Sequence, residues 1–184
     1  LSNSQFDKFI KYFGENYKIL DCTFERDQTL ENAIARLRNE AEKTVREGIT
    51  QIILSDKNIS EAKLPMPMLL CIGAINTHLI KLGLRGYVSI NVQTGDALDT
   101  HSFATLIGVG ATTVNPYLAF DSLYQRYSKK LFGNFSYDEC VARYIKSVNL
   151  GLLKIMSKMG ISVLSSYRGG CNFETVGLSR TIVK

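Results

Sequence analysis

Hydrophobic residues recur along this chain in a repeating unit made of a helix, a glycine and a short apolar strand. The stretch 151–178, GLLKIMSKMGISVLSSYRGGCNFETVGL, shows the unit most clearly. Four of its apolar residues have the spacing of one helical face: Leu152, Ile155, Met156 and Met159. Gly160 then stands where a helix-ending residue is expected. The pattern predicts a strand over 161–164 and a polar, glycine-ended loop over 165–170.

The same pattern continues along the whole chain and predicts alternating strands and helices. Strands are expected over 17–22, 51–54, 87–93, 112–115 and 161–164. Helices are expected over 1–16, from Asp27 or Thr29 to Gly48, and over 67–82, 100–107, 116–127 and 136–159, the last interrupted near Gly151. Such alternation is typical of parallel βαβ units, and five strands are too few for a closed eight-stranded barrel. The predicted fold class is therefore α/β, with parallel β/α repeats in a partial-barrel-like or open layered sheet flanked by helices.

No low-complexity segment or linker divides the sequence, so residues 1–184 are expected to form a single α/β domain. Residues 1–16 would be a leading helix and residues 179–184 a tail. Because the sequence starts at Leu1 rather than at a methionine, we expect a piece of a longer chain or a processed product.

Composition and charge narrow the classes of function. The chain is 45% hydrophobic and 21% charged, which is typical of a soluble globular protein. Its net charge of +5 comes from scattered Lys and Arg residues interleaved with Asp and Glu, so nucleic-acid binding is not expected. We also expect no signal peptide and no membrane segment, because no apolar run is long enough to cross a bilayer.

The cysteines and histidines do not form a metal pattern. Cys22, Cys71, Cys140 and Cys171 lie far apart without a CxxC spacing. They are expected to be reduced, buried thiols, which suits a reducing compartment. With two histidines in the chain a zinc site is not expected, and His78 is predicted to be a helix histidine with a hydrogen-bond partner.

Polar residues after the predicted strands are the candidates for a site, because ligands of α/β folds meet the loops at the carboxyl ends of the strands. Asp56 could position a substrate amine or serve as an ordinary turn residue. The next such loop, QTGDALDTH, contains Gln93, Asp96, Asp99 and His101. These side chains could supply acid–base groups. Capping of the next helix by Asp96 or Asp99, with His101 on its first turn, is the favoured interpretation.

Two further loops carry polar residues. Asn115 ends a predicted strand before Pro116 and could either turn the chain or bind a ligand. The loop SSYRGG contains Ser165 and Arg168, and it could cradle a phosphate or a carboxylate. Alternatively, Arg168 could pair with a carboxylate in a contact between domains. No nucleophile–base pair stands out, so the residues alone indicate an α/β domain without a defined catalytic set.

Several long runs carry a resemblance to a known family. They are IILSDK at 52–57, PMPMLLCIGAINTHLIKLGLR at 65–85, TGDALDTHSFATLIGVGATTVNPYLAF at 94–120, and the stretch 151–178. The runs closely resemble the central domain of the glutamate synthase large subunit, which lies between the glutamine amidotransferase domain and the flavin-binding barrel. The sequence departs from the family pattern at Gln93, where a glutamate is usual, and at Gly170-Cys171, where Ala-Gln is usual. For this reason no family role is carried over to Gln93.

The resemblance implies part of an oxidoreductase that makes glutamate from glutamine and 2-oxoglutarate. In that family, ammonia from the amidotransferase domain passes through an internal tunnel to the flavin, where 2-iminoglutarate is reduced. FMN and an iron–sulfur cluster belong to the neighbouring domain. The electron donor is NADH, NADPH or ferredoxin, in some members through a small NAD(P)H-oxidising subunit or domain. For this chain the resemblance implies a structural and channelling connector with no catalytic, cofactor-binding or metal-binding residue, inactive by itself.

The implied partners are the amidotransferase and FMN-binding domains of the same polypeptide, in a cytoplasmic or plastid-type location, without nucleic acid or membrane. An alternative stays open, namely a self-contained flavin- or phosphate-binding α/β enzyme that uses the Asp96–His101 and Ser165–Gly170 loops. A third is an interaction module without a small-molecule site. A connector should expose apolar surface where its neighbours sit, whereas an enzyme needs a pocket of its own.

Overall fold

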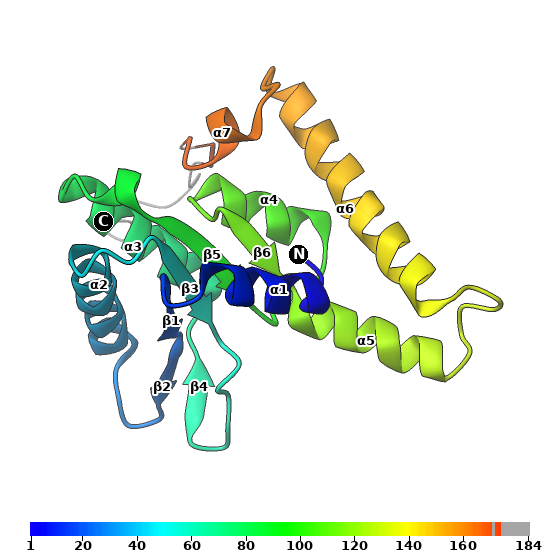
Figure 1. The fold of residues 1–184 in the computed structure, drawn as a ribbon, viewed down its shortest axis with the longest axis horizontal. Helices are drawn as coiled ribbons and strands as arrows, with labels where there is room; N and C mark the ends of the chain where they lie inside the picture. Colours follow the sequence, from blue (N-terminus) through cyan, green and yellow to red (C-terminus); the bar gives the residue numbers. More distant parts are fainter. Residues whose placement is uncertain (171, 174–184) are drawn as a thin grey trace, which may run out of the picture.

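A four-stranded parallel sheet is the centre of the fold. The structure is a computed structural model and describes residues 1–170, 172 and 173. The strands are β1 (Tyr17–Asp21), β3 (Gln51–Ser55), β5 (Ser89–Gln93) and β6 (Thr113–Asn115). They lie in the order β1-β3-β5-β6, and each neighbouring pair is parallel. Within the described residues the sheet is open (Figure 1), which confirms the predicted α/β class without a closed barrel.

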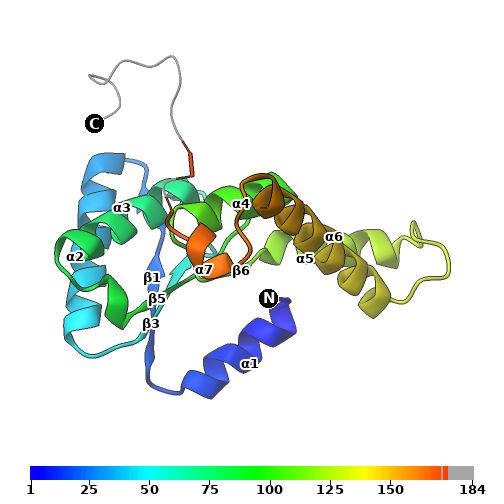
Figure 2. The ribbon, with the colours of Figure 1, turned by 90° about the horizontal axis from the view of Figure 1, so that it is seen from above.

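Helices connect successive strands and cover one face of this sheet. α2 (Leu30–Arg46) follows β1, α3 (Met68–Lys81) follows β3, and α4 (Thr100–Gly108) follows β5. Right-handed crossovers between adjacent parallel strands place all three helices on the same side. Figure 2 shows them there, with α1 (Asn3–Phe13) on the opposite side of the sheet.

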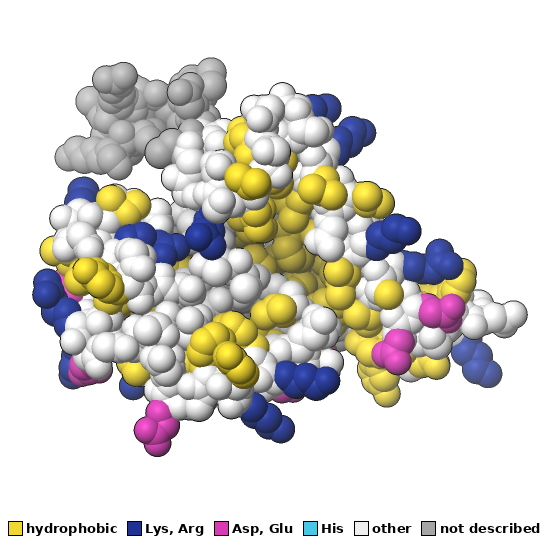
Figure 3. All heavy atoms as spheres, turned by 45° about the horizontal axis from the view of Figure 1, so that its top comes forward, with side chains coloured by type: hydrophobic (Ala, Val, Ile, Leu, Met, Phe, Trp, Pro, Cys, Tyr) yellow, Lys and Arg dark blue, Asp and Glu magenta, His cyan; other side chains and the backbone are white. Residues whose placement is uncertain are grey.

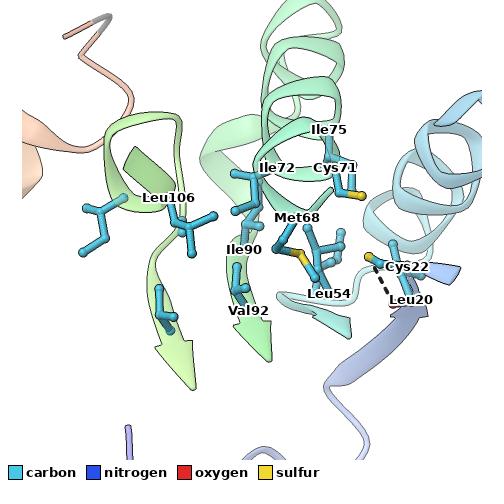
Figure 4. Close-up of a cluster of buried hydrophobic side chains, with 14 of the residues drawn as sticks. Leu20, Cys22, Leu54, Met68, Cys71, Ile72, Ile75, Ile90, Val92 and Leu106 are labelled. Carbon is cyan, nitrogen blue, oxygen red and sulfur yellow. Dashed lines mark hydrogen bonds between the residues drawn. The ribbon is translucent and has the colours of Figure 1, made fainter. Parts of the chain in front are cut away.

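The main hydrophobic core lies between the sheet and these three helices. Alternate residues of each strand point to this side, and among them Leu54, Ile90 and Val92 are fully buried. Figure 4 shows these side chains opposite Cys71 and Ile75 of α3. Each fully buried aliphatic side chain stabilises the fold by about 1.5–3 kcal/mol relative to an exposed one, so this layer fixes the helices to the sheet.

Helix α6 (Tyr137–Lys158) ends at Gly160, which has a φ of 72°. The N–H groups of Gly160 and Ile161 donate to the carbonyls of Ser157 and Met156 at 3.1 and 2.9 Å. This Schellman arrangement satisfies the last carbonyls of the helix and needs a positive φ, which glycine adopts without steric cost. The same bonding pattern ends α2, α3 and α4, at Gly48, Gly83 and Gly110. The helix–glycine–strand unit read from the sequence is confirmed at those three positions.

The predicted strand over 161–164 is wrong. Ile161 completes the ending of α6, and a short helix, α7 (Leu164–Tyr167), begins directly afterwards. The side chain of Leu164 is 44% exposed, and no strand pairs with the outer edge of β6 in the described part of the chain. A high β propensity means that residues fit well into a pleated, half-buried sheet. Residues 161–164 have no neighbouring strand to pair with in the described part of the chain, so they do not form a strand. The predicted loop over 165–170 accordingly begins inside α7.

The remaining predicted helices and strands are confirmed, with small shifts at their ends. The third strand starts at Ser89 because Arg85–Tyr87 form a turn of 3₁₀ helix, η1. An antiparallel pair, β2 (Thr23–Glu25) with β4 (Lys63–Pro65), was not predicted. Strands of three residues inside polar loops are too short to show an alternating pattern. The predicted tail, residues 179–184, lies outside the described residues.

Helices α5 (Tyr117–Ser128) and α6 form an arm that extends from the end of the sheet beside β6 (Figure 1). The predicted interruption of α6 near Gly151 is wrong, because the helix continues through this residue. A Cβ atom at Gly151 would lie 2.5 Å from the methyl carbon of Thr100 in α4. The glycine therefore permits two helices to approach each other closely and does not break one.

Candidate functional site at the carboxyl edge of the sheet

Asp56 is the first residue after β3 and is buried, with 1% of its surface exposed. Its carboxylate accepts a hydrogen bond of 2.6 Å from the hydroxyl of Thr94. The backbone N–H of Gly95 lies 3.1 and 3.2 Å from the two carboxylate oxygens. Thr94 and Gly95 follow β5, the neighbouring strand. Asp56 thus fastens two adjacent loops at the edge where ligands of α/β proteins usually bind.

Tyr117, the first residue of α5, lies beside this carboxylate. Burial and the negative charge of Asp56 raise the pKa of Tyr117 to about 12, so its hydroxyl stays protonated at neutral pH. A Cβ atom at Gly95 would lie 3.3 Å from this hydroxyl oxygen, so a glycine leaves room for the ring. The ammonium group of Lys57 lies 5.4 Å from the centre of the Tyr117 ring, within cation–π range.

A line of neutral polar side chains crosses the same edge from β3 to β6. The hydroxyl of Ser55 donates to Oε1 of Gln93 at 2.9 Å, and Nε2 of Gln93 donates to Oδ1 of Asn115 at 3.3 Å. Nδ2 of Asn115 in turn donates to the carbonyl of Leu1 and to Oδ1 of Asn3, at 3.1 and 3.0 Å. Gln93 and Asn115 therefore join the sheet to the start of α1.

Asp96, Asp99 and His101 do not converge on a common site. Asp96 is exposed and lies 3.5 Å from the N–H of Met68, at the start of α3. Asp99 caps α4, because its carboxylate accepts from the N–H and the hydroxyl of Ser102 at 2.8 and 2.6 Å, and these bonds lower the pKa of Asp99. His101 is exposed on the first turn of α4. The capping interpretation is thus confirmed for Asp99.

The remaining two candidates lie near the other end of the strands. Ser165 is exposed on α7, and Arg168 follows α7. Arg168 lines a pocket with Arg85 at the amino ends of β3, β5 and β6. The structure therefore does not bring the 165–170 loop to the 96–101 loop, and it does not favour a self-contained enzyme that would use both.

The side chains of His78 and of the described cysteines contribute to the packing of the fold and do not form a site. Nε2 of His78 lies 3.0 Å from a carboxylate oxygen of Glu42, so the predicted hydrogen-bond partner is confirmed. Cys22, Cys71 and Cys140 are buried free thiols, and the thiol of Cys71 together with burial holds the pKa of Cys22 well above its ordinary value. Cys171 lies outside the described residues. Across residues 1–170, 172 and 173, no three His, Cys, Asp or Glu side chains gather as metal ligands.

The carboxyl edge therefore offers one buried carboxylate held by neutral donors, a protonated tyrosine and a line of amides. The hydroxyl of Thr94 donates to the carboxylate of Asp56 there, but both residues are buried, so this pair holds the loops together. The sequence patterns assigned no role to Thr94, Tyr117 or Arg85. Thr94 lies inside the loop QTGDALDTH and Tyr117 follows Asn115-Pro116, so both stand next to the candidates, but neither residue type marks a site by itself. A lone arginine in a glycine-flanked turn is the only sequence signal for Arg85.

No helix in the described residues combines the length and the apolar character that crossing a membrane requires.

Known proteins resemble the chain closely. Residues 1–179 match the family described as "Glutamate synthase central domain". The large chains of glutamate synthase [NADPH] from Azospirillum brasilense and Bacillus subtilis are 48% and 43% identical to it over 100% of this chain. The chloroplastic ferredoxin-dependent glutamate synthase of Spinacia oleracea is 41% identical over 84% of this chain. The chain belongs to the glutamate synthase central domain family.

The relatives are much longer than this chain. It spans 12% of the length of each bacterial relative and 10% of the length of the Spinacia relative. The match to the two bacterial relatives nevertheless covers all of this chain, so the fold described above corresponds to one part of those proteins.

Proposed function

We propose that residues 1–184 act as one structural unit of a glutamate synthase large chain. In this proposal the unit holds an amidotransferase domain and an FMN-binding domain of the same polypeptide in register, and it forms part of the ammonia path between them. The whole enzyme would convert glutamine and 2-oxoglutarate reductively to glutamate. Family membership and the full-length matches to glutamate synthase large chains support this proposal.

An apolar groove is the structural observation that carries the proposal. It has a volume of about 250 Å³ and lies between α4, β6 and α6. Figure 3 shows it as the hollow with hydrophobic side chains near the centre of the view. Its lining includes Phe103, Ile107, Val114, Phe120, Ile145 and Val148. A contiguous apolar hollow on a protein surface is typical of a surface that another protein segment covers.

The groove runs beside β6, the last strand of the sheet. In the described residues β5 is the one strand that pairs with β6. At its outer edge β6 is met by the amino group of Leu1, which donates to the carbonyl of Val114 at 2.8 Å, and by no further strand. Exposed sheet edges beside apolar surface are normally covered in the native protein. Docking of a neighbouring domain on this side would cover the edge and the groove together.

The described side chains do not fit an iron–sulfur cluster. Such clusters need converging thiolates, whereas Cys22 and Cys71 face each other inside the core and Cys140 lies on α6. In the proposal these residues hold neither a cluster nor a flavin. In the proposal, FMN and the cluster lie in a neighbouring domain, where FMN supplies the reduction. Electrons come from NADH, NADPH or ferredoxin, through a small subunit or domain where a nicotinamide nucleotide is used. In the proposal this chain holds the neighbouring domains in their relative positions. The proposed location of the enzyme is cytoplasmic or plastid-type.

Charge placed in the groove tests the proposal in a complete glutamate synthase large chain that contains this sequence. Ile145→Asp puts a carboxylate on the groove wall. Because burying an unpaired charge is costly, we expect glutamine-dependent glutamate synthesis to fall about tenfold or more. Ammonia-dependent glutamate synthesis and glutamine hydrolysis, which each need one active site, should stay within about twofold, below 0.5 kcal/mol.

Leu150→Asp is the matched control, since Leu150 is 56% exposed on the same helix and does not line the groove. It should leave all three rates unchanged. Ile145→Ala, which adds no charge, guards against simple misfolding and should give a smaller effect of the same kind. Equal effects of Ile145→Asp and Leu150→Asp would contradict the proposal.

A further inference from the structure

Two arginines from distant parts of the chain share one pocket at the amino ends of the strands. Arg85 belongs to η1, and Arg168 follows α7. The pocket has a volume of about 280 Å³, and Gln51, Ser89 and Thr112 also line it. It lies at the end of the sheet opposite to Asp56, so it is separate from the carboxyl-edge residues described above.

Arg85 is held in place by three neutral acceptors. Its Nε donates to Oδ1 of Asn76 at 2.7 Å, one terminal nitrogen to the carbonyl of Val88 at 2.6 Å, and the other to the carbonyl of Gly110 at 2.9 Å. A guanidinium carries five N–H donors, so about two remain, one on each terminal nitrogen. Arg85 is therefore a fixed cation with spare donors at the pocket.

The two positive charges have no negative partner in the described part of the chain. Neither arginine forms an ion pair with a described carboxylate. Burial, and to a smaller extent the positive charge of Arg168, lower the pKa of Arg85. An arginine stays protonated at neutral pH, so both charges persist and repel. A bound anion between them would relieve this repulsion.

The other polar side chains leave donors for the pocket. Oε1 of Gln51 already accepts a bond of 3.0 Å from Nδ2 of Asn91, which leaves the amide nitrogen of Gln51 as a donor. The hydroxyl oxygen of Thr112 accepts from the N–H of Ile90 at 3.3 Å, which leaves its O–H to donate. Guanidinium, amide and hydroxyl donors around one space match the acceptor-only surface of an oxyanion.

We propose that this pocket binds a small oxyanion, a phosphate or carboxylate group, between Arg85 and Arg168. The volume of about 280 Å³ lies just below the range of about 300–1,000 Å³ that is typical of small-molecule pockets, which suits a ligand of few atoms. The bound anion links α7 to the amino ends of β3, β5 and β6. The site does not depend on the proposed connector role, since the groove beside β6 is a different surface.

Titration of the purified chain with inorganic phosphate tests this site, and sodium chloride at equal ionic strength is the reference. Calorimetry measures the binding of the anion, and thermal unfolding measures the change in the unfolding temperature. We expect saturable binding and a rise in the unfolding temperature above that given by chloride. A parallel titration with acetate distinguishes a carboxylate ligand from a phosphate, because the anion that binds more tightly identifies the preferred group.

Arg168→Gln is the decisive variant, because Arg168 is exposed and its replacement leaves the core intact. We expect it to weaken anion binding about tenfold or more, whereas Arg168→Lys, which keeps a point charge without the planar fork, should retain part of the binding. Arg126→Gln removes the same charge from the exposed side of α5 and should bind as the native chain does. The proposal is overturned if neither anion exceeds the chloride reference, or if Arg168→Gln and Arg126→Gln respond alike.

Discussion

The hydroxyl of Thr94 donates a hydrogen bond of 2.6 Å to the buried carboxylate of Asp56, across 38 residues of sequence. The N–H of Gly95 adds a second donor to the same carboxylate. Both loops lie at the carboxyl edge of the sheet. The contact therefore fixes the loop after β3 relative to the loop after β5.

Replacing Asp56 should therefore destabilise the fold. Asp56→Ala leaves the Thr94 hydroxyl and the Gly95 N–H without their acceptor, and we expect a loss of about 2–4 kcal/mol in the free energy of unfolding. Asp96→Ala is the control, since Asp96 is exposed and makes one long contact of 3.5 Å, and it should cost less than about 1 kcal/mol. Urea denaturation measures both. Similar losses for the two variants would show that the buried carboxylate does not fasten the loops.

Two tyrosines should make the stability fall in alkaline solution. Burial, with the charge of Asp56 for Tyr117 and of Asp99 for Tyr144, raises the pKa of each to about 12 from 10.0. The folded chain therefore holds these protons more tightly than the unfolded chain does. Their contribution is fully present below pH 10 and is lost as the pH rises towards 12.

Urea unfolding at a series of pH values between about 9 and 11.5 tests this dependence, because that range spans the ordinary tyrosine pKa. The double replacement Tyr117→Phe and Tyr144→Phe removes both titrating groups, so we expect a shallower decline than in the native chain. Tyr12→Phe is the control, since Tyr12 is 83% exposed. Parallel declines in the double variant and the native chain would refute the assignment to these two hydroxyls.

Gly151 allows α6 to approach α4 closely at Thr100. Adding a methyl group at position 151 should therefore lower the free energy of unfolding. A Cβ atom at Gly151 would lie 2.5 Å from the Thr100 methyl and 2.6 Å from its hydroxyl oxygen. We expect Gly151→Ala to destabilise the chain by about 1–3 kcal/mol through overpacking, less the gain of up to about 1 kcal/mol in helix propensity.

The double variant with Thr100→Ala removes both close atoms and should recover most of that loss. Thermal or urea unfolding of the two single variants and the double variant gives a coupling energy, which we expect to exceed about 1 kcal/mol. Additive effects would mean that the two residues do not limit the approach of the helices.

The sequence predicts the β/α alternation well because each unit ends in a local signal. Gly48 and Gly83 follow apolar helical faces, and their helices end through bonds between near neighbours in sequence. The strand predicted over 161–164 fails for the opposite reason. Whether such a run pairs depends on a neighbouring strand, which a short local pattern does not contain.

In the candidate site, too, the sequence predicts what local patterns determine and misses what depends on contacts between distant residues. The sequence places Asp56, Gln93 and Asn115 at or directly after the ends of strands, and the structure brings all three to one edge of the sheet. Their partners could not be predicted, since the Thr94 hydroxyl reaches Asp56 only after β3 and β5 pair. The meeting of Arg85 with Arg168 likewise depends on the path of the chain after α6.

The source of the nitrogen in the product tests the connector role most directly. A complete large chain containing this sequence is supplied with glutamine labelled with ¹⁵N at the amide, 2-oxoglutarate, its electron donor and an excess of unlabelled ammonium. Mass spectrometry then measures the label in the new amino group of glutamate. We expect the native enzyme and Leu150→Asp to retain the label, and Ile145→Asp to incorporate mostly unlabelled nitrogen. If Ile145→Asp retains the label as fully as the native enzyme does, the groove beside β6 does not help to join the two active sites and the account is contradicted.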